Sequence, residues 1–193
     1  MKILNPFLTS FQERISYIYS MKILLTGANG YIGMRLLPLL LEAGHEVVCV
    51  VRNAKRLAVD TKIRARIEII EIDFLETPEK GKLPSDIDAA YYLIHSMSSS
   101  TQDFDEKEAR SATHFLEYLS TTNCKQVIYL SGISNEEQLS KHLSSRKNVE
   151  EILSKGIEVH LNLMKTYALP VEEILSKLEN FKGLDLESIY VVD

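Results

Sequence analysis

The sequence predicts an α/β protein in which parallel strands alternate with crossover helices. Two observations support this fold class: short apolar runs recur along the 193 residues, and helix-length amphipathic segments separate them. The composition, with 45% hydrophobic and 25% charged residues, is that of a globular protein long enough to bury one good core. We therefore expect a doubly wound parallel sheet with helices on both faces, which is a three-layer αβα arrangement.

Apolar runs and their boundaries define six strands and the helices between them. Gly44 ends the first helix, and Pro38 inside that helix predicts a kink. The expected strands are 22–26, 47–51, 66–74, 88–96, 125–132 and 156–163, and the expected helices are 31–43, 103–121 and 139–154. Right-handed crossovers would give this Rossmann-type sheet the strand order 3-2-1-4-5-6.

The predicted organisation is a Rossmann domain at 21–163, an N-terminal extension at 1–20 and a divergent tail at 164–193. The extension is interpreted either as a weak amphipathic helix or, as we favour, as the product of an upstream start codon before Met21. The tail predicts one amphipathic helix at about 170–181 and a short strand after it. Whether the tail belongs natively to the fold is left open.

Composition argues against several classes of partner. The net charge of −5 and the absence of a dense Lys/Arg run do not favour nucleic acid. No apolar run reaches the length of a membrane span and no signal peptide is evident, so we expect a cytoplasmic protein. The five histidines lack metal-ligand spacing, and Cys49 and Cys124 lie in or beside apolar stretches, as buried free thiols do.

A glycine-rich turn joins the first strand to the first helix. The glycines follow the pattern G-x-x-G-x-x-G, which permits a tight turn, a close approach of the backbone to a pyrophosphate and close packing of the helix. The helix N-terminus would then offer N–H groups and positive dipole to the phosphates. The residues expected to bind the dinucleotide here are Gly27, Asn29, Gly30, Tyr31, Ile32 and Gly33.

The end of the second strand favours NADP over NAD. An NAD site usually places Asp or Glu there for the ribose 2′-hydroxyl, whereas this chain has Arg52 followed by Asn53. A guanidinium can bind a 2′-phosphate with paired hydrogen bonds, although Arg52 could also be a solvated loop charge. After the third strand, Asp73 could accept from the adenine amino group with Phe74 packed nearby, or it could cap a helix.

These motifs, together with "YYLIHSMSS" at 91–99, "YLSGI" at 129–133 and "LSKHLSSRKNVEEIL" at 139–153, resemble the atypical short-chain dehydrogenases/reductases. Within them the chain is most similar to the NAD(P)-binding, NmrA-like branch. The resemblance covers about 21–161 and implies cofactor contacts from His95 and Ser96, at the carboxyl end of the fourth strand. It also implies an oxidoreductase that passes hydride to an unknown carbonyl or enone.

The chain departs from that family at its catalytic motif and its ending. Members use Tyr-x-x-x-Lys on the helix after the fifth strand, and none of the nine tyrosines here has lysine four residues later. His142 and Arg146 stand at the matching place with the same offset, so His142 is a candidate proton donor and Arg146 a candidate ligand of ribose or phosphate. The alternative, which we favour, is that His142, Arg146 and Lys147 form an exposed face of the helix. Ser131 matches the family's active-site serine region, or it could only cap a turn.

Three functions remain open at the level of sequence. The first is an NADPH-dependent reductase, and the second is a non-catalytic dinucleotide-binding or redox-sensing module in which the cofactor alters a protein contact. The third is a truncated domain without activity, because family-like sequence stops near Leu161 and leaves no segments for a substrate pocket. The sequence does not fix the substrate, the protein partner or the oligomeric state.

Overall fold

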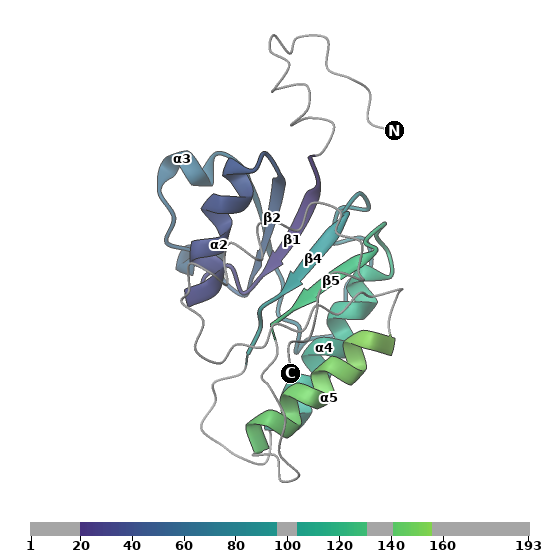
Figure 1. The fold of residues 1–193 in the computed structure, drawn as a ribbon. Helices are drawn as coiled ribbons and strands as arrows, with labels where there is room; N and C mark the ends of the chain where they lie inside the picture. Colours follow the sequence, from purple (N-terminus) through teal and green to yellow (C-terminus); the bar gives the residue numbers. More distant parts are fainter. Residues whose placement is uncertain (1–19, 96–103, 131–140, 156–193) are drawn as a thin grey trace, which may run out of the picture.

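The computed structural model describes residues 20–95, 104–130 and 141–155. Five parallel strands form one sheet in the order β3-β2-β1-β4-β5. Figure 1 labels β2, β1, β4 and β5, which follow one another across the sheet. The strands are β1 (Lys22–Thr26), β2 (Glu46–Val51), β3 (Ile67–Glu71), β4 (Ala89–Tyr92) and β5 (Gln126–Tyr129). The predicted fold class and the order of these five strands are confirmed, while the expected strand at 156–163 and helix at 170–181 lie outside the described residues.

Helices cover both faces of the sheet, which makes three layers (Figure 1). One face carries α2 (Tyr31–Glu42) and the short helices η1 (Ala54–Arg56) and α3 (Thr61–Arg64). The other carries α4 (Phe104–Leu119) and α5 (Lys141–Lys155), which also pack on each other. The molecule is therefore doubly wound, as the alternation of strands and helices predicts.

Alternating residues of each strand enter the two cores because successive side chains of a strand point to opposite faces. In β1, Leu25 packs in the core under α2, whereas Leu24 packs in the core under α4 and α5. In β4, Tyr91 and Tyr92 divide in the same way. Parallel sheets buried on both faces need such continuous apolar strands.

Element boundaries differ from the predictions mainly at the carboxyl ends of strands. The third strand was expected to extend to Phe74 but β3 ends at Glu71, and the fourth ends at Tyr92 rather than at residue 96. The sequence also did not predict η1 and α3. α2 continues through Pro38, and the kink expected there stays a prediction.

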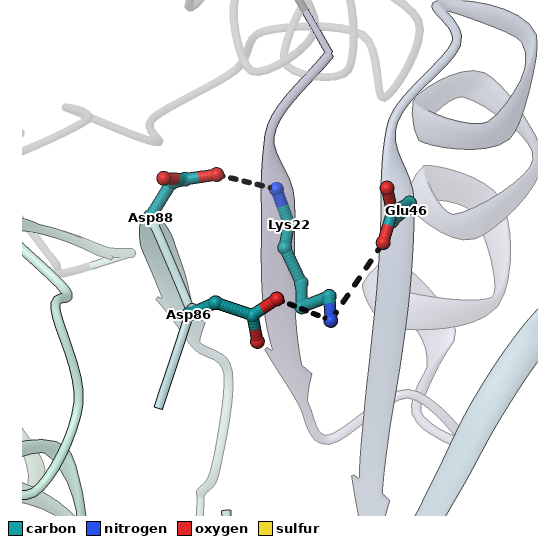
Figure 2. A network of polar contacts seen from close by, with 4 residues as sticks. All are labelled: Lys22, Glu46, Asp86 and Asp88. Carbon is teal, nitrogen blue, oxygen red and sulfur yellow. Dashed lines mark hydrogen bonds and ion pairs between the residues drawn. The ribbon is translucent and has the colours of Figure 1, made fainter. Parts of the chain in front are cut away.

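A charged network ties the amino-terminal edge of the sheet together (Figure 2). The ammonium of Lys22 lies 2.7 Å from Asp86 Oδ2 and 3.7 Å from Glu46 Oε2. The backbone N–H of Lys22 donates to Asp88 Oδ2 at 2.7 Å. The hydrogen bond from the Lys22 ammonium to Asp86 is the main reason that the pKa of Lys22 is raised. One residue of β1 thus joins β2 to the segment that enters β4, at the edge opposite the strands' carboxyl ends.

Candidate functional site

A cavity of about 550 Å³ lies at the carboxyl ends of the strands. This is the edge at which open α/β sheets bind ligands, and the volume falls within the range of small-molecule sites. Its walls come from the glycine turn, the ends of β2, β3 and β4, and the first half of α4. The lining residues are Gly27, Asn29, Gly30, Val50, Val51, Arg52, Asn53, Arg56, Ile72, Asp73, Phe74, Leu75, Leu93, Ile94, His95, Lys107 and Ser111.

The structure requires glycine at two positions of the glycine turn, Gly27 and Gly33. Gly27 has φ +63°, and a Cβ added there would lie 2.6 Å from the carbonyl oxygen of Leu93. Gly30 precedes α2, and its N–H donates to the Gly27 oxygen at 2.8 Å. A Cβ on Gly33 would overlap the Gly27 oxygen and lie 2.8 Å from the Ala28 Cα. The first turn of α2 therefore sits directly against the loop, as the spacing of the glycines predicts.

The N-terminus of α2 faces this cavity without a side-chain cap. Gly30 is the N-cap residue, and α2 has no acidic residue in its first turn. The first N–H groups of a helix have no partner within it, so they are available to an anion. Tyr31 and Ile32 do not line the cavity: Tyr31 is 61% exposed beneath the guanidinium of Arg35, and Ile32 packs against the core. The cofactor contacts expected of these two residues therefore stay predictions.

Two arginines line the cavity where β2 ends. Arg52 follows β2, and Arg56 closes the short helix η1. Asn53 holds the loop between them, because its Oδ1 accepts from the N–H of Lys55 at 2.9 Å. Glu71 holds it from β3, accepting from the N–H of Ala54 at 2.5 Å. The sequence singled out Arg52 but treated Arg56 as a partly solvated charge, because nothing in the pattern reveals the short helical turn.

The loop after β3 forms the neighbouring wall. Asp73 is half-buried, and its Oδ1 accepts from the N–H of Leu75 at 3.0 Å. The carboxylate thus closes a turn rather than capping a helix. The ring of Phe74 is buried against Phe115 and Tyr118 of α4. Both predicted residues line the cavity, but the packing of the Phe74 ring is with the protein core.

The segment that follows β4, residues 93–95, forms another wall of the cavity. The Thr26 hydroxyl bridges β1 and β4, donating to the Tyr91 oxygen at 2.9 Å and accepting from the Leu93 N–H at 3.1 Å. His95 lines the cavity, and its ring lies 6.2 Å from that of Tyr129. Burial, with a smaller effect of the Arg146 charge, lowers the pKa of His95 to about 4. His95 is therefore a neutral imidazole near pH 7.

The residues predicted for catalysis are only partly described. Ser131 and Ser96 lie outside the described residues, and His142 belongs to α5 but its side chain lies outside them as well. Arg146 is half-buried on α5, where its backbone oxygen accepts from the Tyr129 hydroxyl at 3.5 Å. The positive charge of Arg146 is close enough to lower the pKa of His95, so this part of α5 lies near the β4 side of the cavity.

The charge of the lining suits a phosphate-rich ligand. Arg52, Arg56 and Lys107 contribute positive charge, and Asp73 is the one carboxylate among the lining residues that the structure describes. The sequence did not predict that Lys107 and Ser111 line the cavity, because apolar periodicity does not reveal how α4 is placed on the sheet. A dinucleotide fits this arrangement, since a glycine cradle, an uncapped helix N-terminus and cations meet in one cavity.

The described parts of the chain hold no candidate metal centre. They contain no group of three or more His, Cys, Asp or Glu side chains that could hold a metal ion. No helix in residues 20–95, 104–130 or 141–155 is long and apolar enough to cross a membrane. Cys49 and Cys124 are buried free thiols, as predicted. Burial raises the pKa of Cys49 to about 12 and that of Cys124 to about 11.

Comparison with solved structures returns proteins of the same fold. A Bacillus halodurans protein assigned to the NAD-dependent epimerases/dehydratases superposes with a TM-score of 0.67 at 15% identity, over 88% of this chain and 91% of that one. UDP-glucuronic acid 4-epimerase from Bacillus cereus, solved with NAD, gives 0.58 at 22% identity, over 75% of this chain and 56% of its own. The Bordetella bronchiseptica enzyme WbmG, also with NAD, gives 0.57 at 15% identity, over 76% and 53%.

This chain thus spans little more than half the length of the last two enzymes. No curated protein sequence matches it. The model of the NAD dependent epimerase/dehydratase family matches residues 23–142, well over half of the chain. That match begins in β1, includes the glycine turn and every wall of the cavity, and ends where α5 begins. The chain belongs to the NAD-dependent epimerase/dehydratase family.

Proposed function

We propose that the protein binds NADP(H) in the cavity at the carboxyl edge of the sheet. The observation that carries the proposal is the pair Arg52 and Arg56, which line the cavity together where an NAD site usually has a carboxylate. Guanidinium groups bind phosphate with paired, charge-assisted hydrogen bonds. The pyrophosphate then lies at Gly27, Gly30 and the N-terminus of α2, and the 2′-phosphate lies between the two arginines.

The remaining predicted contacts follow from this placement. Asp73 accepts from the adenine amino group through its Oδ2, since its Oδ1 is occupied by the N–H of Leu75. His95 contacts the cofactor from the segment that follows β4, and the contact predicted for Ser96, which lies outside the described residues, belongs to the same proposal. The motif at 91–97 supports assignment of the chain to the NmrA-like branch. That the protein is cytoplasmic stays a prediction from the sequence.

Two functions can follow from NADP(H) binding. In the first, the protein is an oxidoreductase: hydride passes from the cofactor to a carbonyl or enone, His142 donates a proton, Ser131 orients the substrate oxygen, and Arg146 holds ribose or phosphate. In the second, the protein binds the cofactor without turnover and senses its redox state. The lack of a Tyr-x-x-x-Lys motif favours the second function.

Calorimetric titration of the full chain with NADPH and NADH tests binding. Arg52→Gln and Arg56→Gln should each weaken NADPH binding by about 10- to 100-fold, because each removes a charge-assisted contact worth about 1.5–3 kcal/mol. NADH affinity should change less than about threefold. Lys62→Gln is the matched control, since Lys62 is an exposed cation of α3 that does not line the cavity.

Each result bears on a separate part of the proposal. If the folded wild type binds neither nucleotide, the dinucleotide site is wrong. If NADPH binds but both arginine variants retain its affinity, the 2′-phosphate assignment is wrong.

NADPH oxidation over a panel of carbonyls and enones then separates the two functions. Turnover that His142→Gln abolishes supports the oxidoreductase with His142 as donor, and turnover that survives it removes that role. Tight binding with no turnover on any substrate supports the sensor.

A further inference from the structure

One face of α4 builds a wall of the cavity and also fastens the loop after β3. Its residues Lys107, Ser111, His114, Phe115 and Tyr118 follow the spacing of a single helical stripe. The first two line the cavity directly. The other three contact the segment Phe74–Glu79, which is about 40 residues away in sequence.

Two hydrogen bonds and two ring contacts join α4 to this loop. His114 Nδ1 lies 2.8 Å from the carbonyl oxygen of Phe74. The Tyr118 hydroxyl accepts from the N–H of Glu79 at 3.1 Å. The Phe74 ring meets the Phe115 and Tyr118 rings edge-on, with centroids 5.7 and 5.6 Å apart. Edge-to-face pairs at such distances are favourable beyond the area that they bury.

The hydrogen bond between His114 Nδ1 and the Phe74 carbonyl oxygen determines which protonation states of His114 can hold the loop. A carbonyl oxygen only accepts, so Nδ1 must carry the proton and donate it. The neutral tautomer with its proton on Nδ1 and the imidazolium can both make this bond. The bond fixes the Phe74 peptide, and Phe74 directly follows the carboxylate of Asp73, which has its own Oδ1 held by Leu75.

We propose that His114 and Tyr118 are positioning residues for recognition of the adenine base, acting through the loop that carries Asp73. This inference rests on the proposed binding of NADP(H). Neither side chain is among the residues that line the cavity. They act by holding Asp73 in one place, so that the bond from the adenine amino group is formed without a further loss of loop freedom. Pre-organisation of this kind raises affinity without adding a contact.

The experiment compares NADPH with its deamino analogue, in which hypoxanthine replaces adenine and the amino group is missing. The wild type should bind NADPH about 10-fold more tightly than the analogue, as expected for one hydrogen bond to a charged acceptor. His114→Leu should reduce that ratio to about twofold or less. His114→Asn, whose side-chain amide can donate from nearly the same position, should restore most of it.

His45→Leu is the matched control. The Nδ1 of His45 also bonds to the backbone, accepting from the N–H of Met21 at 3.3 Å, but at the opposite edge of the sheet. Its loss should lower stability without changing the NADPH ratio. Tyr118→Phe removes one hydroxyl and keeps the ring packing, so it tests the same loop if His114→Leu does not fold, and it should lower the ratio by about two- to fivefold.

The results distinguish an error in the positioning role from an error in the proposed binding of NADP(H). A wild type that binds neither ligand overturns NADP(H) binding itself. A wild type that binds both ligands equally, or a ratio unchanged in His114→Leu and Tyr118→Phe, overturns the positioning role while leaving cofactor binding intact. A ratio that falls equally in His45→Leu would show a general loss of structure and would also overturn it.

Discussion

Gly33→Ala tests whether the close approach of α2 to the glycine turn is as tight as the structure indicates. Intrinsic helix propensity predicts that this change stabilises the protein, since Ala is favoured over Gly inside a helix by about 1 kcal/mol. The structure predicts the opposite sign. The new Cβ would overlap the Gly27 oxygen and lie 2.8 Å from the Ala28 Cα, and both are backbone atoms that cannot rotate away.

The expected magnitude follows from these two opposing effects. Overpacking costs about 1–3 kcal/mol, and the upper end applies here because a tight turn must move. Subtracting about 1 kcal/mol of helix propensity leaves a net loss of about 2 kcal/mol. For a domain of this size, each kcal/mol lowers Tm by about 2–4 °C, so we expect a fall of about 4–8 °C.

Urea denaturation followed by circular dichroism measures the effect, and the m-value should not change. Gly81→Ala is the control for backbone conformation alone, because Gly81 has φ +75° and nothing lies within 4 Å of the added Cβ. It should cost about 1–2 kcal/mol. If Gly33→Ala is as stable as the wild type, or more stable, the argument from close packing is refuted.

Two further substitutions test the two edges of the sheet, and one labelling experiment tests its core. Thr26→Val should lose about 1–3 kcal/mol of unfolding free energy, because it leaves the buried Tyr91 carbonyl and the partly buried Leu93 N–H without the hydroxyl that now bonds to both; an unchanged denaturation midpoint would contradict this. Lys22→Met should lose about 1 kcal/mol in low salt and nearly nothing in 1 M NaCl, since its carboxylate partners are exposed; the wild-type contribution should also fade as the pH rises above 10.5, because the folded-state pKa is raised. Cys49 and Cys124 should react with a thiol reagent at pH 8 only as fast as the protein opens, since burial raises both pKa values; rapid labelling of the native protein would show that they are accessible.

The sequence predicts the sheet well because its signals are local. Each buried strand is a continuous apolar run, and the glycine spacing identifies the turn whose geometry the structure bears out at Gly27 and Gly33. Short helical turns such as η1 and α3 carry no apolar periodicity, so they give no such signal. Strand ends are also weakly marked: β3 stops at Glu71, while the apolar alternation continues to Phe74 because the loop itself is buried against α4.

The candidate site could be predicted where it depends on the end of a strand, and not where it depends on a helix. Arg52, Asp73 and His95 follow strands and were found, because parallel strands bring their carboxyl ends to one edge. Lys107 and Ser111 reach the cavity through the placement of α4, which is set by long-range packing. His114 was missed for the same reason, since its partner is a backbone carbonyl 40 residues away.

The lowered pKa of His95 makes it a poor proton donor for a reaction near pH 7. Near pH 7 its pKa of about 4 leaves about one molecule in a thousand protonated, so His95 offers a neutral hydrogen-bonding group rather than an acid. The same shift predicts that the native state loses stability as the pH falls from 6.5 toward 4, because the unfolded chain binds a proton there that the folded chain does not. His95→Gln should flatten this part of a profile of Tm against pH, and an equally steep profile would show that burial of His95 is not its cause. If turnover is found, a limb of its pH profile near 6.5 that survives His95→Gln would assign the proton to another residue, as a donor at His142 requires.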